Sequence, residues 1–541
     1  MAGTPASTGS FPRAAACPGP FDALAITGQL DVEEIHRWDR MPLWGHSWRV
    51  SLQGALDLVN QTLSIESVGR GQDPAPLSVR LDVERYLTQP DWRLGFVWSG
   101  FPLDPLAPIA RHLGLPLPED ARLSGSVDGS VTVSRRDMLE GAVQLRDAAM
   151  VLAGGPPVRF ARADLLLQRD TVTLPPAQVE IPDQGSVQVQ GSYSSLSGLL
   201  TASIRTAGLP SAAFRLQAFG IPEPLPDAMR EGRWSGELRY RQERNTTGAW
   251  SGQAVITHAA FPVPGLAAPV QLSRGVLTVN GPGWRLTDVR ASAGGVEFGG
   301  DYDAAASTFR LRLGETDLAQ LEALFEPSLL RPGGFLARTL RLGRPAAPRW
   351  LAARRLSGGI QAEALVLGPA RFTGVSGRLR WDGTRIELSQ LRARIEGGSV
   401  LANGAIDLAG SEPSYAINVL GERIAWRNGR LTIDGDFAAS GAGSNLLATL
   451  GSEGMFELAG APAGFDSLAG CYRLDLTRTP SLRLSELRAA AGSEIYLGTG
   501  ALRDDGTLLV ELESGARQLR VIGTLAGLRV EHPPGWSADP D

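Results

Sequence analysis

Apolar and polar residues alternate along most of this chain. In the segments 187–189, 386–388 and 431–433, two apolar residues flank one polar residue, and the same rhythm surrounds each segment. Successive side chains of a β-strand point to opposite faces of its sheet. This period of two therefore predicts strands with one apolar face and one face in water.

A two-strand phrase recurs along the chain and closes each time on a glycine. The closing residues are Gly191, Gly300, Gly404 and Gly500, roughly 100 residues apart. A weaker copy includes Leu63. A β-solenoid repeats every 20–30 residues or so, and the longer spacing speaks against one. We expect a mainly β fold: an elongated, curved antiparallel sheet of repeated strand hairpins, with a few short helices.

Turn signals stand between the expected strands. Asp382-Gly383 and Asn428-Gly429 separate apolar segments, and both pairs favour the positive φ angles of tight hairpins. The Asn403-Gly404 pair matches the interior of a strand in the other copies of the phrase. There we expect a bulge or close packing instead of a turn.

Helical patterns are few and short. They cover residues 31–39, 104–113, 317–325 and 444–450, and Asp317 is placed to cap the clearest of them. The stretch 326–356 is rich in arginine and proline and predicts an exposed connector with room for a short helix. We expect a repeated β-groove region at 21–325 and a second β region at 357–530. Residues 1–20 and 531–541 are expected to be disordered.

The composition of the chain gives no support to two classes of protein, nucleic-acid-binding proteins and proteins with a membrane-spanning helix. The chain has 541 residues, a formal net charge of −5 and a hydrophobic fraction of 43%, which is in the globular range. No basic block stands out, so nothing indicates nucleic-acid binding. No run of about 18 apolar residues predicts a membrane-spanning helix.

Residues with the spacing of a reactive site are absent from the sequence. The five histidines are scattered, and two cysteines, Cys17 and Cys471, do not make a metal cluster; whether they pair is open. No nucleophile elbow, phosphate loop or dinucleotide fingerprint is found. We therefore expect no enzyme, no metal and no cofactor. A pair of carboxylates acting across neighbouring strands stays open, because pairing between strands is not visible in sequence.

Two segments of the carboxy-terminal third resemble a known family. Residues 440–458, SGAGSNLLATLGSEGMFEL, are similar to the helix-then-strand phrase of the AsmA-like proteins of diderm bacteria, and residues 519–525, LRVIGTL, resemble the strand that closes their carboxy-terminal domain. The resemblance extends over about residues 24–530. AsmA-like proteins usually begin with an inner-membrane helix, which is not found here, so we expect a fragment that lacks its amino-terminal anchor.

The resemblance implies a periplasmic protein that carries phospholipid between inner and outer membranes along an apolar β-groove, without catalytic residues. It implies acyl chains as ligands and inner- and outer-membrane proteins as partners. A scaffold for outer-membrane protein assembly is the alternative. The residues expected to contact lipid are Val172, Leu174, Val187, Val189, Val279, Leu286, Leu379, Trp381, Ile386, Leu388, Val400, Ile406, Leu431 and Ile433.

Overall fold

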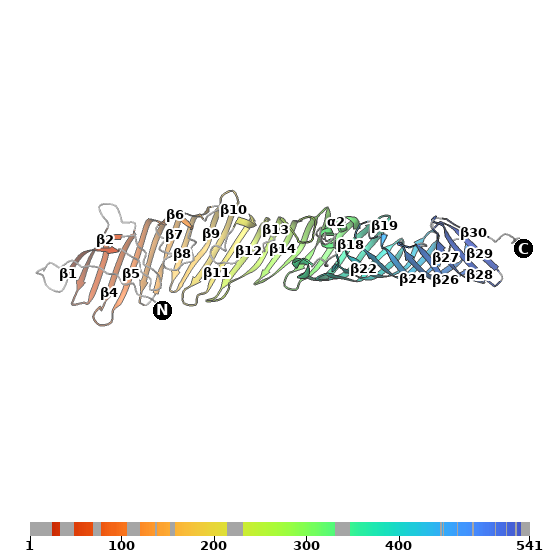
Figure 1. Ribbon diagram of the computed structural model, residues 1–541. Coiled ribbons are helices and arrows are strands. Elements are labelled where there is room, and N and C mark those ends of the chain that lie inside the picture. Colours follow the sequence, from red (N-terminus) through yellow and green to blue (C-terminus); the bar gives the residue numbers. More distant parts are fainter. Residues whose placement is uncertain are drawn as a thin grey trace, which may run out of the picture. The chain divides into compact units, whose positions relative to one another are not determined.

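The computed structural model describes two compact parts of the chain. The described residues are 24–32, 48–68, 77–104, 120–135, 138–151, 157–213, 225, 231–330, 347–443, 446, 448–461, 464–478, 481–503, 505–515, 517–524 and 527–531. Unit 1 comprises Met1–Ala259 and Leu277–Trp284, and unit 2 comprises Ala260–Val276 and Arg285–Asp541. Strands dominate both units, which confirms the expected mainly β fold (Figure 1).

The strands that lie mostly or wholly in unit 1 follow one another with few helical interruptions. They are β1 (Leu24–Val32), β2 (Trp48–Asp57), β3 (Thr62–Val68), β4 (Leu77–Glu84), β5 (Asp91–Pro102), β6 (Arg122–Ser134), β7 (Met138–Val151), β8 (Val158–Gln168), β9 (Thr171–Ile181), β10 (Gly185–Ser194), β11 (Leu200–Pro210), β12 (Arg233–Gln242) and β13 (Ala249–Phe261). A short 3-10 helix, η1 (Ser211–Ala213), follows β11. The division between the units falls within β13, β14 (Val270–Asn280) and β15 (Gly283–Ala293).

Unit 2 contains the remaining strands and both α-helices of the described residues. These are β16 (Val296–Asp303), β17 (Thr308–Asp317), α2 (Leu318–Leu329), α4 (Arg349–Ala352), β18 (Arg355–Leu367), β19 (Ala370–Asp382), β20 (Arg385–Ile395), β21 (Gly398–Asp407), β22 (Ser414–Trp426), β23 (Gly429–Ser440), β24 (Gly451–Ala459), β25 (Ser467–Asp475), β26 (Leu482–Ala491), β27 (Glu494–Leu502), β28 (Leu508–Ser514), β29 (Arg517–Thr524) and β30 (Gly527–Glu531).

Neighbours in sequence are neighbours in the sheet. From β1 to β13, and again from β15 to β17 and from β18 to β30, each strand pairs antiparallel with the next. One pair differs from the expected antiparallel pattern, because β17 and β18 run parallel. A parallel neighbour needs a crossover connection, and α2 and α4 belong to that connection.

The recurring sequence phrase corresponds to a bulged strand and the strand after it. The register shifts in β15 between Leu286 and Val289, in β20 between Leu388 and Leu391, and in β26 between Leu484 and Leu487. Closing glycines lie opposite these bulges: Gly300, Gly404 and Gly500 pair with Val289, Leu388 and Leu484. The repeat thus preserves a bend in the sheet at each copy.

Close packing explains the strand glycine at Asn403-Gly404. A Cβ on Gly404 would lie 2.9 Å from the carbonyl oxygen of Ala416 on the next strand. The Asn403 side chain accepts a hydrogen bond of 2.9 Å from the backbone N–H of Gln390, which lies inside the opposing bulge with φ of 54°. Of the two alternatives expected at Asn403-Gly404, close packing is confirmed, whereas the bulge lies in the opposing strand β20.

A proline pair sets the face of β9. Leu174 pairs with Gly191, and Ala177 pairs with Val189, so Pro175 and Pro176 fall in a bulge. Prolines cannot donate to the ladder and are placed where the ladder is interrupted. The bulge reverses the alternation, and the apolar residues before and after it stay on one face.

The helix predictions have mixed outcomes. Asp317 accepts a hydrogen bond of 2.8 Å from the backbone N–H of Ala319 and caps α2, as expected. The prediction for 31–39 is wrong at its start, because Asp31 is in β1 and pairs with Arg49; its later residues lie outside the described part. Residues 105–113 also lie outside it. In 444–450, residues 446 and 448 are helical.

The connector expected at 326–356 contains the short helix that was expected, α4, but its described residues are not exposed throughout. Leu351 of α4 has no exposed surface. The α2 helix continues through Pro327 to Leu329, and β18 begins at Arg355. Leu351 is buried because it packs against Trp381 and Ile386 of the sheet.

The polar face of the sheet is covered by cross-strand ion pairs. Glu237 lies directly opposite Arg205, with 2.5 Å between carboxylate and guanidinium. Arg239, two residues along the same strand, donates to the other carboxylate oxygen at 2.8 Å. Hydrogen bonds from Arg205 and Arg239 lower the pKa of Glu237 to about 2. Such exposed pairs each contribute roughly 0–1 kcal/mol.

The first prediction concerns Gly300. Its φ is 140°, and an added Cβ would overlap the carbonyl oxygen of Arg310. Gly300→Ala should destabilise unit 2 by about 1–3 kcal/mol through backbone strain. Gly314→Ala, on the adjacent strand with open space around its Cβ, is the control and should change stability by no more than about 0.5 kcal/mol. Urea unfolding of both variants measures the difference, and equal midpoints would contradict the strain argument.

The second prediction concerns pH. The pKa of Glu237 is about 2 in the folded chain and 4.5 without its partners. Its stabilising contribution is therefore complete above about pH 4.5 and declines as pH falls towards 2. Glu237→Gln should lower the unfolding temperature at pH 6, and this deficit should shrink by pH 3. Thermal unfolding at both pH values tests this, and a deficit that stays constant would oppose it.

Candidate functional site

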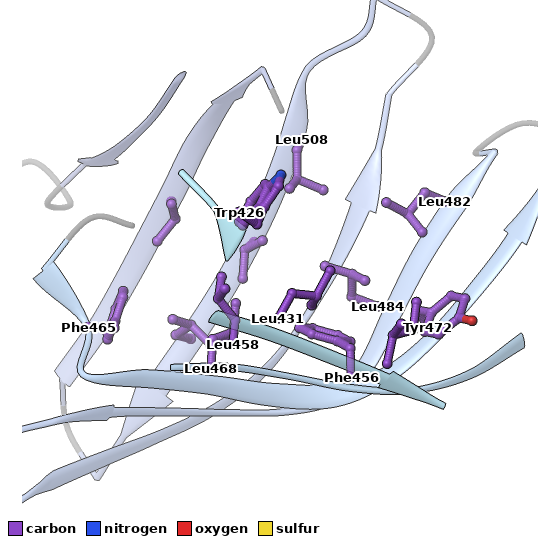
Figure 2. A pocket seen from close by; sticks show the side chains of 14 residues that line it. Trp426, Leu431, Phe456, Leu458, Phe465, Leu468, Tyr472, Leu482, Leu484 and Leu508 are labelled. Carbon is purple, nitrogen blue, oxygen red and sulfur yellow. The ribbon is translucent and has the colours of Figure 1, made fainter. Parts of the chain in front are cut away.

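The apolar face of unit 2 encloses a cavity of about 240 Å³ between β22 and β29 (Figure 2). Fourteen side chains line it, and none of them carries a charge. They are Trp426, Leu431, Ile433, Phe456, Leu458, Phe465, Leu468, Tyr472, Leu482, Leu484, Leu508, Val510, Leu512 and Val521.

Strand alternation supplies the lining. On β28, Leu508, Val510 and Leu512 are buried, while Glu511 and Glu513 between and after them are exposed. On β23 and β24, Leu431 pairs with Leu458, and directly opposed residues share a face. The sequence pattern thus places an apolar side chain at every second position of β28, from Leu508 to Leu512.

Curvature brings the two walls together. Four strands, β24 to β27, separate β23 from β28 along the ladder. In a flat sheet these two strands would lie about 24 Å apart, at about 4.8 Å per strand. Both line the same cavity, so the sheet bends around it with its apolar face inward. The bulges of β22 and β26 are devices for such bending.

Tightly packed residues form the base of the cavity. Leu487 and Ala489 have no exposed surface, and the rings of Phe465 and Tyr496 meet edge to face at 6.1 Å. In contrast, Leu431, Ile433 and Phe456 are only half-buried. The site is therefore a lined hollow with a packed base, and part of its apolar wall stays accessible.

Few polar atoms touch the cavity. The Tyr472 hydroxyl lies 3.0 Å from the Ser452 hydroxyl, which satisfies both groups, and burial raises the pKa of the Tyr472 phenol. Trp426 is the last residue of β22, and the guanidinium of Arg427 lies 5.0 Å from its ring centre. Arg427 itself is exposed in the turn, so it is a cation beside the apolar site.

None of the fourteen residues expected on the apolar face is exposed. Val187, Val279, Leu286, Trp381 and Ile386 are buried. The rest are half-buried, namely Val172, Leu174, Val189, Leu379, Leu388, Val400, Ile406, Leu431 and Ile433. Register places Leu379 opposite Leu388 and Trp381 opposite Ile386, as the shared face requires.

Only Leu431 and Ile433 of the expected residues line the cavity. Leu379, Trp381, Ile386 and Ile406 belong instead to a cluster that includes residues of α2 and α4. Most of the cavity was missed, because its walls come from strands far apart along the chain. The alternation in 508–512, LLVEL, was a usable signal for the far wall.

A second hollow, of about 560 Å³, is polar. Its lining includes Glu511, Glu513, Glu531 and Arg520, and Arg520 donates to Glu511 at 3.2 Å. Glu511 and Glu513 belong to the exposed face of β28, opposite to the face of Val510. No buried polar group points into this hollow among the residues that line it, and we assign it no chemistry.

The described residues contain no group of three or more His, Cys, Asp or Glu side chains placed to hold a metal ion. Cys471 lies on β25 with its sulfur 3.9 Å from a Glu486 carboxylate oxygen, and Cys17 lies outside the described part. Of the histidines, only His258 is described, in β13. Within the same ranges, no helix has the length and apolar character needed to cross a membrane.

Comparison with protein-family models, with curated proteins and with solved structures finds no match.

The cavity wall generates a stability prediction. Leu484 lines the cavity and is 9% exposed, and Leu484→Ala should destabilise the chain by about 2–5 kcal/mol through lost burial and an enlarged void. Leu497 lies on the outer face of β27 and is 57% exposed, so Leu497→Ala should cost under about 0.5 kcal/mol. Urea unfolding compares the two, and a similar loss in both would mean that the wall is not packed as described.

Proposed function

We propose that this chain binds phospholipid by its acyl chains and carries it along the apolar face of its sheet, as a non-enzymatic transfer protein. The observation that carries the proposal is the cavity between β22 and β29, lined only by apolar and aromatic residues. Ligand sites are usually mostly apolar with a few placed polar groups. Here the polar groups are so few that a hydrocarbon is the ligand class that fits.

The size of the cavity supports this ligand class. A dry apolar cavity of about 150 Å³ already binds benzene. The cavity of about 240 Å³ has more room, and the half-buried wall at Leu431, Ile433 and Phe456 continues the apolar surface beyond it. Burial of each CH₂ group contributes about 0.8 kcal/mol, so a bound acyl segment is stabilised without any specific hydrogen bond.

The charged groups near the site suit an amphiphile. Arg427 lies over the ring of Trp426 at the end of β22, and its side chain is exposed. An acyl chain in the cavity would leave its head group in water, and a phosphate within reach of Arg427 would gain a charge-assisted contact. This arrangement favours a phospholipid over a neutral hydrocarbon.

The resemblance of residues 440–458 and 519–525 to AsmA-like proteins supports the same function. It adds the setting: the periplasm of a diderm bacterium and transport between its two membranes. These elements of the proposal rest on the resemblance alone, whereas the ligand class also rests on the cavity.

Two adjacent residues of β24, one on each face of the sheet, provide a test of lipid binding. Phe456 lines the cavity, and Met455 points to the opposite face and is 60% exposed. Phe456→Asp places a charge in the apolar wall and should lower co-purified phospholipid at least tenfold, since burying an unpaired carboxylate beside hydrocarbon is unfavourable. Met455→Asp is the matched control and should retain the wild-type amount. Native mass spectrometry of protein purified in mild detergent measures both.

A second variant, which introduces no charge, distinguishes loss of lipid binding from misfolding. Ile433→Trp fills space in the same wall and should also reduce bound phospholipid, with the unfolding midpoint close to wild type. Wild-type protein that is consistently free of lipid would overturn the proposed function. Equal lipid in Phe456→Asp and Met455→Asp would place the ligand elsewhere. Cross-links from position 433 to protein instead of lipid would favour an assembly scaffold.

A further inference from the structure

Strand register brings arginines that are distant in sequence onto one row of the polar face of unit 2. Gly299 of β16 lies directly opposite both Arg290 of β15 and Arg312 of β17. Arg312 is in turn aligned with Gln361 of β18. Aligned residues of neighbouring strands share one face of a sheet, so these four residues belong to the same face. Arg290, Arg312 and Gln361 are exposed, which identifies it as the polar face.

The row continues across the next two strands, and a further arginine lies beside it. Gln361 lies opposite Ser376 of β19, and Ser376 lies opposite Arg392 of β20. Arg378, two residues after Ser376 on the same strand, lies opposite Gly359 of β18. Arg378 and Arg392 are exposed as well. The arginine patch, as we call it, consists of Arg290, Arg312, Arg378 and Arg392.

No carboxylate neutralises the arginine patch. Among the described residues, none of its four guanidinium groups forms an ion pair, whereas arginines at its border do. Arg310 pairs with Asp301 at 3.7 Å, and Arg371 pairs with Glu315 at 2.8 Å. The patch therefore differs from the rest of the polar face, where arginine and carboxylate lie opposite each other and cancel.

The next charges along the strands leave the excess positive charge in place. Glu363 follows Gln361 by two residues on β18, and Arg394 follows Arg392 by two residues on β20. One is an anion and the other a cation, so they offset each other. Three strand spacings, about 14 Å at about 4.8 Å per strand, separate Arg312 from Arg392, and Arg378 lies on a strand between them. An anion seated among these side chains would be attracted by several of them at once.

The chemistry of the patch favours phosphate. A guanidinium group presents its N–H donors as a planar fork that matches two oxygens of one phosphate. The strand positions between the arginines carry small or uncharged residues, which leaves room for such a group to approach the sheet. These residues are Gly299, Gly359, Gln361 and Ser376.

The surroundings of the patch favour a lipid surface over a nucleic acid. None of the residues between the arginines is aromatic, so a nucleobase finds no ring there on which to stack. Leu401 of β21 lies directly opposite Arg392 and is 40% exposed. A cation beside an exposed aliphatic side chain matches the boundary of a bilayer, where phosphate groups meet hydrocarbon.

We propose that the arginine patch docks unit 2 on an anionic phospholipid surface, with its guanidinium groups bound to phosphate oxygens of the head groups. The patch lies on the polar face and the cavity on the apolar face, so this contact is separate from the proposed binding of acyl chains. Sequence shows no basic block here, because the four arginines are spread over residues 290–392 and only register assembles them.

Vesicle flotation tests the contact. An arginine near an anionic lipid surface strengthens binding about fivefold, so the wild-type chain should bind vesicles of equal parts phosphatidylglycerol and phosphatidylcholine at least tenfold better than pure phosphatidylcholine. The variant Arg312→Gln with Arg378→Gln and Arg392→Gln should lose at least tenfold on the mixed vesicles. Raising the salt from about 0.1 M to about 1 M should abolish the wild-type preference, since the Debye length falls from about 10 Å to about 3 Å.

A control variant removes the same amount of charge from the same face outside the patch. Its three arginines are paired with Asp303, Glu453 and Glu511 respectively, and the changes are Arg285→Gln, Arg473→Gln and Arg520→Gln. This variant should keep the wild-type preference for the mixed vesicles. Equal losses in the two variants would overturn the proposal, because binding would then follow net charge alone.

Two further results would overturn the patch as a lipid contact. One is equal binding of the wild-type chain to both kinds of vesicle. The other is tighter binding to a duplex DNA oligonucleotide than to the mixed vesicles, lost in the patch variant, which would assign the patch to nucleic acid. Co-purified phospholipid is measured in the same samples and should stay at the wild-type amount in both variants, since neither changes the cavity. Wild-type protein that lacks co-purified lipid but still prefers the mixed vesicles would overturn the proposed function and leave the patch standing.

Discussion

One-sided burial is the constraint on which this structure depends. Each strand must keep its apolar residues on one face across many consecutive pairings, because a slip of one residue would turn that whole set into water. The bulges of β15, β20 and β26 interrupt the alternation, and each does so at the same point of the repeated phrase. The sheet can therefore bend repeatedly while its apolar face stays continuous. The ion pairs of the other face, such as Arg473 with Glu453 at 2.6 Å, are exposed and contribute little to stability.

Sequence reasoning recovered the features that are local. The alternation predicted strands and the shared face, and the capping Asp317 predicted the start of α2. The closing glycines identified the repeat, although the bulge opposite each of them was not foreseen, because a bulge depends on which residues the partner strand presents. The Pro175-Pro176 pair is the clearest example: simple parity separates Leu174 from Val179, and the bulge returns them to one face.

Features set by distant pairings were beyond the sequence. The parallel pairing of β17 with β18 has no local signal, and without it the arginine- and proline-rich stretch resembles an exposed connector. Once that pairing exists, the chain between the two strands must cross one face of the sheet. It crosses the apolar face, because Phe325, Leu329 and Leu351 are apolar and pack there. The cavity could not be predicted from the sequence either, because its two walls approach each other only through the curvature of the sheet from β23 to β28.

An apolar sheet face in water needs a cover, and unit 2 covers two parts of this face and leaves a third part half-buried. Between β24 and β29 the sheet curves and packs its own side chains around Leu487. Over β19 and β20 the chain lays its crossover helices on the face. Along β21 to β24, residues such as Val400, Ile433 and Phe456 are left half-buried. An apolar surface of this kind favours association with something apolar. The covered parts and the wall differ in exposure: Leu487 in the packed core and Leu351 under the helices have no exposed surface, whereas Ile433 and Phe456 stay half-buried.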